Sequence, residues 1–270
     1  MASIRDQIDR TTTPDHEALP EQARLNLDTR NPGIWHLVIT ETDGAIAAYA
    51  QAKVSGASVE LQMLDDLWDP RFEQLLAQAD LSSRSLTMWK HGVVGNVTVP
   101  EGFHIDRALR FLHRSLPADP IHPTSYVLRS FIVGRDEDSW LDLNAKIFAA
   151  HPDQGAWSID DLERRIDSSW FDPSLFLVLA DGNDLIGFCW VKIEPQHPQR
   201  GEIFVIGVDP KVAGRGIGRF LVTSGLDAMT RRGAREAVLY VENDNLAALQ
   251  LYKTLGFQEL SRDYRLIRNH

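Results

Sequence analysis

Three glycines at alternate positions, Gly214, Gly216 and Gly218, form the segment of this chain best suited to chemistry. They lie between an apolar stretch, 202–208, and a helical pattern that begins at Arg219. Glycines spaced in this way let the backbone approach a ligand and direct several N–H groups at one point, and the N-terminus of the following helix adds partial positive charge. The segment therefore predicts a site for an anion such as a pyrophosphate.

The glycine segment by itself does not establish a binding role. Any turn between a strand and a helix can carry glycines, so a purely structural role competes with a binding role. No Gly-Lys-Ser/Thr follows, which excludes a P-loop. Several other strands and two helices are predicted before the segment in its domain, which makes a dinucleotide fingerprint a poor fit. Arg215 and Arg219 supply local positive charge.

The overall composition is that of an acidic globular protein. The 270 residues include 28 Lys and Arg against 38 Asp and Glu, a formal net charge of −10. This balance argues against nucleic acid as the main partner, because phosphate binding needs a basic surface. Cys189 is the only cysteine, so no internal disulfide can form and no cysteine cluster can hold a metal. The histidines show no metal-site spacing, and we expect no metal.

We expect a cytoplasmic protein that does not enter membranes. No apolar run approaches the roughly 18 residues needed to cross a bilayer. The first ten residues alternate charged and apolar side chains, unlike a secretory signal. We also expect the protein to be a monomer.

The elements that must position the glycine segment fall into two similar halves. Three prolines within 116–124 form an extended linker, which predicts domains at 1–120 and 121–270. In the second half the patterns predict strands at 125–131, 175–179, 185–193, 202–208, 237–241 and 264–268, and helices at 136–150, 160–169, 219–232 and 245–255. The first half repeats much of this order, with strands at 36–40, 45–52, 58–64, 86–89 and 108–114 and a helix at 71–79.

With these elements in place, the segments 208–219 and 240–257 resemble the GCN5-related N-acetyltransferase (GNAT) superfamily. The resemblance implies an α/β (α+β) fold of tandem GNAT-like domains, each a mixed, mostly antiparallel sheet flanked by helices. It also implies that acetyl-CoA is the co-substrate. The cofactor-binding residues that it implies are Ile206, Gly207, Val208, Ala213, Gly214, Arg215, Gly216, Ile217, Gly218, Arg219, Asn245, Leu246, Ala247, Ala248, Leu249 and Gln250. Ala213 departs from the family pattern, in which Gln or Arg opens the loop, so a side-chain contact is lost there.

A closer resemblance is to the mycothiol acetyltransferase family. It rests on the segments 151–157, 170–173, 187–198 and 201–210. It implies transfer of acetyl from acetyl-CoA to the cysteine amine of cysteinyl-glucosaminyl-inositol (desacetylmycothiol), an amino pseudodisaccharide, by direct attack in a ternary complex. Two alternatives remain: a tandem GNAT enzyme that acetylates another small amine, such as an aminoglycoside or a peptide N-terminus, and a non-catalytic acyl-CoA-binding protein.

The chemistry of this transfer, with the resemblance, assigns catalytic roles. The acceptor amine must lose a proton, so a base is needed, and the match makes Glu202 that base. Tyr252 is the candidate acid for the CoA thiolate, although its spacing with Leu249 and Phe257 would also suit a core stripe. The backbone N–H of Val208 is the candidate donor to the thioester oxygen, and Ile206 and Gly207 would pair with pantetheine.

For the acceptor, the resemblance indicates Glu21, Asp153, Lys192, Glu202 and Tyr240. Without it, Lys192 would be an ordinary strand lysine and Glu21 an exposed glutamate at a helix start. Cys189 is expected to be a packing residue.

The first half has no Gly-x-Gly after its third strand, and the three aspartates that follow that strand would repel a pyrophosphate. We therefore expect the first half to be structural and to shape one wall of the acceptor cleft.

Overall fold

The protein, seen here in a computed structural model, divides into two compact units. The structure describes residues 33–43, 45–64, 67–117, 124–149 and 154–269. Unit 1 consists of residues 1–110 together with 260–270, and unit 2 of residues 111–259. The division therefore falls after Arg110 and not near residue 120. Residues 260–270 belong with unit 1, because the end of the last strand pairs with a strand of that unit.

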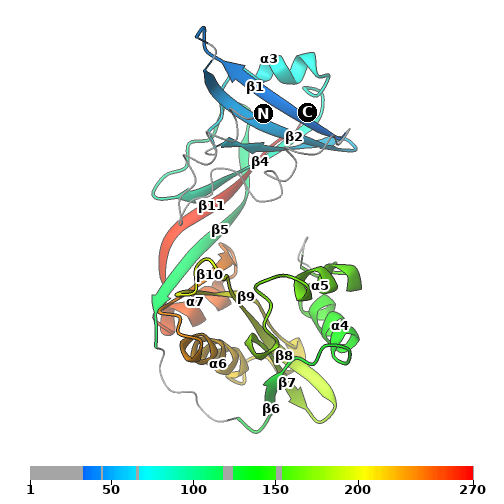
Figure 1. The fold of residues 1–270 in the computed structure, drawn as a ribbon, viewed down its shortest axis with the longest axis vertical. Coiled ribbons are helices and arrows are strands. Elements are labelled where there is room, and N and C mark those ends of the chain that lie inside the picture. Colours follow the sequence, from blue (N-terminus) through cyan, green and yellow to red (C-terminus); the bar gives the residue numbers. More distant parts are fainter. Residues whose placement is uncertain (1–32, 44, 65–66, 118–123, 150–153, 270) are drawn as a thin grey trace. The chain divides into compact units, whose positions relative to one another are not determined.

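Unit 1 is built on a mixed sheet with the strand order β1-β2-β3-β4-β11 (Figure 1). The elements are β1 (Ile34–Thr40), β2 (Ile46–Ser55), β3 (Ser58–Met63), α3 (Phe72–Gln78), β4 (Ser85–Val93) and β11 (Gln258–Arg268). Only the β3–β4 pair is parallel among these neighbours, and α3 provides the crossover that a parallel pair requires. Phe72 and Leu76 of α3 are buried on the sheet.

Unit 2 contains the strands β10-β9-β8-β7-β6 in that order, again with mixed pairing. Its elements up to the central strand are β6 (Val127–Ser130), α4 (Glu137–Ile147), α5 (Ile159–Ile166), η2 (Pro173–Leu175), β7 (Phe176–Asp181), β8 (Asp184–Ile193) and β9 (Arg200–Val208). After it come η3 (Pro210–Val212), α6 (Ile217–Arg231), β10 (Glu236–Glu242) and α7 (Leu246–Thr254). Strands β6 to β9 pair antiparallel, whereas β10 is parallel to β9. The strand β5 (His104–Ser115), like β11, has residues in both units.

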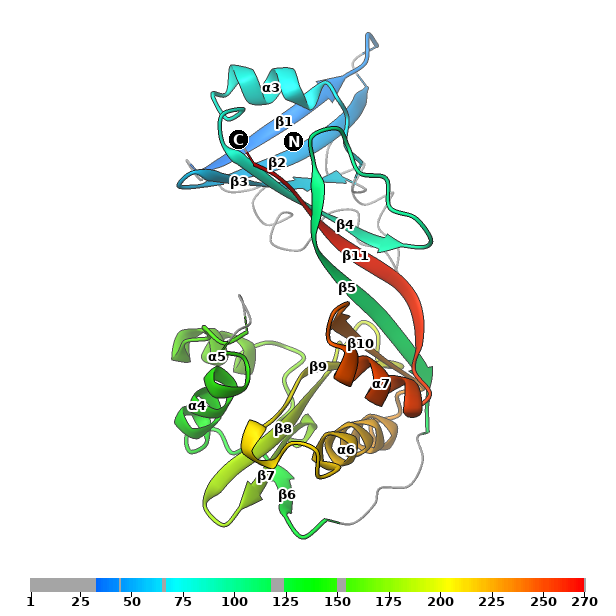
Figure 2. The same ribbon diagram turned by 180° about the vertical axis from the view of Figure 1, so that it is seen from behind.

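Two cores cover the two faces of the unit 2 sheet. Helices α6 and α7 pack on one face with a mostly aliphatic cluster that includes Leu221, Leu226 and Tyr252. Helices α4 and α5 cover the other face with an aromatic cluster around Trp140 and Trp190. Figure 2 shows these two pairs of helices on opposite sides of β8 and β9.

The sequence patterns predicted these elements well. Every helix and strand expected within the described residues is present, and the two tandem halves are both α/β, as expected. Several strands are longer than their patterns indicated: β4 continues to Val93, β5 begins at His104 and β11 begins at Gln258. Gly256 has φ +81°, and the Phe257 N–H donates to the Tyr252 carbonyl, so Gly256 ends α7 as expected of a C-cap glycine.

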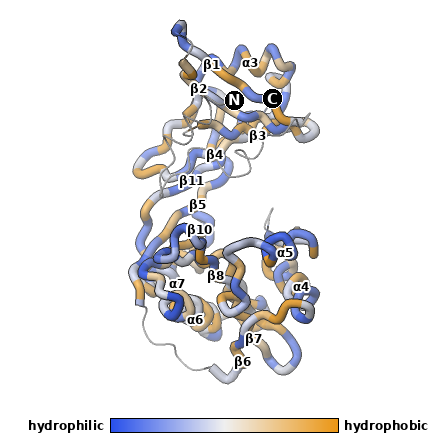
Figure 3. Tube along the Cα trace, viewed as in Figure 1, coloured by the Kyte–Doolittle hydropathy of each residue, from blue (hydrophilic) through white to orange (hydrophobic). Residues whose placement is uncertain are grey.

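Hydrophobic and hydrophilic residues are interspersed along the chain in both units (Figure 3). Within the described parts of the chain, no helix is both long enough and apolar enough to span a membrane.

Candidate active site

The strands β9 and β10 diverge in the middle of unit 2. Their register runs only from Arg200 opposite Glu236 to Glu202 opposite Val238. On its other edge β9 stays paired with β8 as far as Val208. Among the described residues of these two strands, no pairing extends past Glu202, so the edge of β9 that faced β10 is left without a strand partner from there on.

Two N–H groups point to this open edge. The Asp209 N–H donates to the Ile186 carbonyl of β8 at 2.9 Å. Because successive residues of a strand direct their N–H groups to opposite edges, Val208 and Ile206 direct theirs away from β8. The same alternation turns the polar groups of Gly207 toward β8. A Cβ on Gly207 would lie 2.8 Å from Ile147 Cδ1, so its missing side chain makes room for α4.

An irregularity in β9 decides which face each side chain occupies. Trp190 pairs with Val205 but Val191 pairs with Ile203, which leaves Phe204 as an extra residue, as in a β-bulge. Ile203 packs in the α6 cluster, and Phe204 and Val205 both belong to the aromatic cluster. Glu202 therefore lies on the aromatic face, one residue before Ile203.

Glu202 stands where the two strands diverge, partly buried between β8 and β10. Its cross-strand neighbours are Lys192 on β8 and Val238 on β10. Burial raises the pKa of the Glu202 carboxyl; the Lys192 charge lowers it and the Glu194 charge raises it. A carboxylate with a raised pKa is a better proton acceptor than an ordinary one.

Tyr252 lies on the opposite face, in the α6 cluster, where it is 5 % exposed. Its ring meets the Phe257 ring edge-on at 5.6 Å. Burial raises the pKa of the phenol, and nearby Cys189 adds to the effect. Cys189 is itself fully buried. It packs so tightly against α6 that a Cβ added to Gly225 would lie only 2.7 Å from its Sγ. Cys189 is thus a packing residue, as expected.

The glycine loop lies between the end of β9 and α6. Gly214 and Gly216 both have φ +78°, a conformation that other residues adopt only with strain, and the backbone from Ala213 to Gly216 is exposed. Ile217 begins α6 and is buried. A Cβ added to Gly218 would lie 3.4 Å from Leu251 of α7, so the absence of a side chain lets α7 lie close to α6.

Charged anchors hold this loop at both ends. Asp209 accepts from Lys146 Nζ at 2.5 Å and from the Lys211 N–H at 2.9 Å, and these bonds lower the Asp209 pKa. Arg219 donates to Thr254 Oγ1 of α7 at 2.6 Å. The Lys146–Asp209 bond was not anticipated, because a lysine in the last turn of a helix carries no sequence signal for a partner 63 residues away.

The helix α7 supplies a framework next to the loop. Asn245 is its N-cap and accepts from the Ala248 N–H at 3.1 Å. Leu246 is 73 % exposed, whereas Ala248 and Leu249 pack against the α6 cluster. Ala247 and Gln250 lie in the same helix.

Two of the residues expected to bind the acceptor lie on β8 and β10. The Lys192 ammonium lies 5.4 Å from the centre of the Trp170 ring. Tyr240 alternates with the buried residues of β10, so it shares the face of Val238, and its ring lies 4.7 Å from the Phe111 ring. Glu21 and Asp153 lie outside the described residues.

Sequence reasoning missed an aromatic wall on the Glu202 face. Trp170 and Trp190 both contact Phe204, at 5.3 and 5.5 Å between ring centres. Trp157 lies 6.2 Å from the same ring. The high tryptophan content of 157–190 was the available signal. The indole N–H groups of Trp140 and Trp190 are buried and, among the described residues, have no hydrogen-bond partner.

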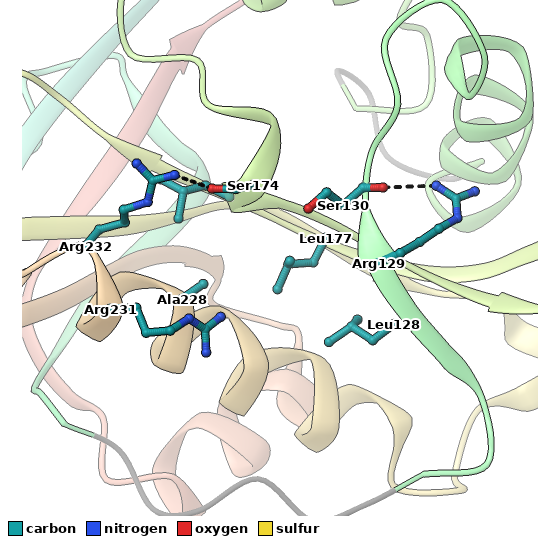
Figure 4. Close-up of a pocket in the computed structure, with 9 residues that line it drawn as sticks. Leu128, Arg129, Ser130, Ser174, Leu177, Ala228, Arg231 and Arg232 are labelled. Carbon is teal, nitrogen blue, oxygen red and sulfur yellow. Dashed lines mark hydrogen bonds between the residues drawn. The ribbon is translucent and has the colours of Figure 1, made fainter.

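A separate cavity of about 500 Å³ lies at the other end of α6 (Figure 4). Its lining combines apolar residues, such as Leu128, Leu177 and Ala228, with several arginines. Arg129 is paired with Asp136 and Arg232 with Asp172, so their charges are already neutralised. Nothing in its lining resembles a transfer site. Among the described residues, no group of three or more His, Cys, Asp or Glu could hold a metal ion.

The diverging strands, glycine loop and flanking helices define an acetyltransferase of the GNAT class. Residues 138–257 match the family described as "Acetyltransferase (GNAT) family", whose members use acetyl-CoA. A solved tandem GNAT protein from the clavulanic acid biosynthesis pathway has the same fold, with a TM-score of 0.64 at 15 % identity over 98 % of this chain and 93 % of the other.

Two sequence relatives narrow the family. The chain is 40 % identical to the mycothiol acetyltransferase of Thermobispora bispora over 200 residues, 70 % of this chain and 68 % of the relative. It is 34 % identical to the mycothiol acetyltransferase of Acidimicrobium ferrooxidans over 288 aligned positions, 99 % of this chain and 92 % of the relative. The chain belongs to the mycothiol acetyltransferase family.

Proposed function

We propose that this protein transfers acetyl from acetyl-CoA to the cysteine amine of cysteinyl-glucosaminyl-inositol by direct attack, which yields mycothiol. The observation that carries this proposal is the divergence of β9 from β10 directly after Glu202. It sets a carboxylate beside an edge of β9 where, among the described residues of β9 and β10, two N–H donors have no strand partner. The names of the relatives supply the acceptor. We further propose that the protein works as a monomer in the cytoplasm.

The open edge and the glycine loop suit the two ends of acetyl-CoA. Ile206 and Val208 would hydrogen-bond the pantetheine arm as an added strand does. The backbone of the exposed residues 214–216 and the N-terminus of α6 would bind the pyrophosphate. Ala213 contributes only its backbone, and Arg219, held by Thr254, keeps its charge beside the loop.

The proposed reaction moves three protons and replaces the C–S bond by a C–N bond. Glu202 takes a proton from the α-ammonium group, whose ordinary pKa is about 7.7–8.0. The amine nitrogen then forms a bond to the thioester carbon, and the Val208 N–H stabilises the negative charge on the oxygen. The C–S bond breaks and the CoA thiolate takes the Tyr252 proton. The new amide nitrogen gives up its extra proton to the Tyr252 phenolate, which restores the phenol, and Glu202 releases its proton to water. Burial raises the pKa of Tyr252, so the phenol carries its proton when the reaction begins.

A thiol-release assay tests this function. Acetyl-CoA is supplied with cysteinyl-glucosaminyl-inositol and, in parallel, with free cysteine, glucosamine and an aminoglycoside. We expect turnover with the cysteinyl pseudodisaccharide only. Turnover with another amine instead would retain acetyl transfer and overturn the acceptor. Acetyl-CoA binding without turnover on any amine would favour the acyl-CoA-binding alternative.

Gly216→Ala tests the loop. An alanine held at positive φ costs about 1–2 kcal/mol, and binding must maintain that conformation, so we expect the Kd for acetyl-CoA to rise about tenfold. Gly233→Ala is the matched control, because Gly233 has φ +87° and follows the other end of the same helix. Calorimetric titration of both variants compares them. Equal effects of the two substitutions on binding would contradict a role of the loop in holding acetyl-CoA.

Tyr252→Phe tests the acid. Phenylalanine keeps the ring and its edge-on contact with Phe257, so removal of the hydroxyl leaves the core packed. We expect kcat to fall about 100-fold, with little change in the KM for acetyl-CoA and none in the unfolding midpoint. Steady-state kinetics and thermal unfolding measure these quantities, and an unchanged kcat would remove Tyr252 from the mechanism.

A further inference from the structure

Glu194, the first residue after β8, forms an ion pair with Lys192. The Lys192 ammonium also faces the Trp170 ring, and Lys192 is the cross-strand neighbour of Glu202. The Lys192 side chain is 20 % exposed and that of Glu194 44 %. One half-buried positive charge therefore stands among two carboxylates, one of which is the proposed base.

The backbone after β8 fixes the position of Glu194. The His197 N–H donates to the Glu194 carbonyl at 2.9 Å, and the Arg200 N–H donates to the His197 carbonyl at 3.0 Å. Pro195 fixes its own φ inside the first of these turns. The Gln199 carbonyl accepts two N–H groups, from Arg235 at 2.8 Å and Glu236 at 3.1 Å. Two turns and this anchor to β10 hold the segment that begins at Glu194.

The other charges of this face are occupied elsewhere. The Arg200 guanidinium donates to Glu236 at 2.9 Å, and His113 Nδ1 lies 3.1 Å from the second Glu236 oxygen. On the helix side, Arg165 of α5 lies over the Trp157 ring at 3.8 Å. Within the described residues, the charges that act on Glu202 are thus those of Lys192 and Glu194, with opposite sign.

If Lys192 had no other partner, its charge would act on Glu202 alone. That charge would lower the pKa of the Glu202 carboxyl and make Glu202 a poor proton acceptor. The Glu194 carboxylate, which pairs with the same ammonium group, counteracts this lowering of the pKa. We propose that Glu194 is a positioning residue for acetyl transfer: it holds Lys192 between two carboxylates and leaves Glu202 free to take the proton of the incoming amine. The catalytic part of this inference rests on the proposed function, whereas the charge arrangement does not.

Glu194→Gln separates these two parts with two readouts. The first is a ¹³C NMR titration of glutamate side-chain carboxyls in the full chain, with the Glu202 signal identified by its loss in Glu202→Gln. We expect the Glu202 midpoint to fall by about half to one pH unit. The second is the pH profile of kcat/KM, whose acidic limb should move down by the same amount while the plateau falls several-fold. Glu194→Asp should restore both in part.

Asp172→Asn is the matched control, because Asp172 pairs with Arg232 at 2.6 Å on the surface of the same unit and should alter neither readout. An unchanged Glu202 midpoint in Glu194→Gln would overturn the inference whatever the activity. A shifted midpoint with an unmoved kinetic limb would overturn the positioning role. Failure of the wild type to acetylate any amine would instead count against the proposed function, and the NMR titration would still decide the charge arrangement.

Discussion

Glu202→Gln should lower kcat/KM for acetyl transfer by about 10²–10⁴-fold, the range for loss of a general base. Glutamine has nearly the same shape but cannot accept the proton of the α-ammonium group. The substitution also removes a partly buried carboxylate whose pKa is raised by burial, so the fold should be at least as stable. Steady-state kinetics with the cysteinyl pseudodisaccharide measure the loss.

The Kd for acetyl-CoA is the internal control for this variant, because the open edge of β9 and the glycine loop are untouched. Glu163→Gln, on the exposed surface of α5, is the external control and should retain full activity. A Glu202→Gln enzyme within tenfold of the wild type would show that another group, or water alone, takes the proton.

The pH dependence of the wild type follows from the same carboxyl. Glu202 acts as a base only when ionised, so kcat/KM should fall as the pH drops through its pKa. Because burial raises that pKa above the ordinary value of about 4.3, this limb should lie above pH 4.3. It should be absent from the residual activity of Glu202→Gln. Rates measured across the acidic range check both statements.

Trp190→Ala should destabilise unit 2 by about 3–5 kcal/mol, as truncation of a buried Trp or Phe does. Trp190 is fully buried and stacks on Phe176 with 4.1 Å between ring centres. It also meets Trp140 at 5.9 Å and Phe204 at 5.5 Å. Its loss would open a cavity beneath the wall that supports Glu202. Urea unfolding followed by circular dichroism measures the change.

Two variants make this prediction specific. Trp35→Ala removes the same side chain from a position that is 45 % exposed, and it should cost far less. Trp190→Phe should also cost far less than alanine, because the Trp190 indole N–H has no partner among the described residues and phenylalanine loses no hydrogen bond. A Trp190→Ala cost below about 1 kcal/mol would mean that the aromatic cluster is loosely packed.

The local sequence predicts those parts of the site that depend on a residue's own conformational preferences or on its immediate neighbours in the chain. The glycine loop is one, because positive φ at Gly214 and Gly216 is a property of the residues themselves. The burial of Cys189 between flanking aromatic residues is another. The roles of Glu202 and Tyr252 came from family resemblance and remain predictions. Alternation along β9 could not predict on which face of the sheet Glu202 lies. The irregularity at Phe204 shifts the alternation of side chains on the two sides of that residue.

Contacts between distant segments lay beyond such reasoning. Lys146 and Asp209, or Lys192 and Glu194 beside Glu202, become partners only when strands and helices pack. The end of β11 was assigned to the second half because it follows that half in the chain. Its pairing with β4 puts residues 260–270 in unit 1 instead, and no local pattern encodes which edge a strand will join.

The amino-acid sequence by itself determined the order and type of the elements, the glycine conformation of the loop and the acidic, nearly cysteine-free composition. Periodicity, glycine conformation and charge are local, so they can be read without coordinates. The tertiary structure alone decided where β9 leaves β10, which side chains meet across the sheet, and which carboxylate shares the lysine beside Glu202. Those features depend on register and packing between segments far apart in the chain, where a shift of one residue reverses the face of every side chain.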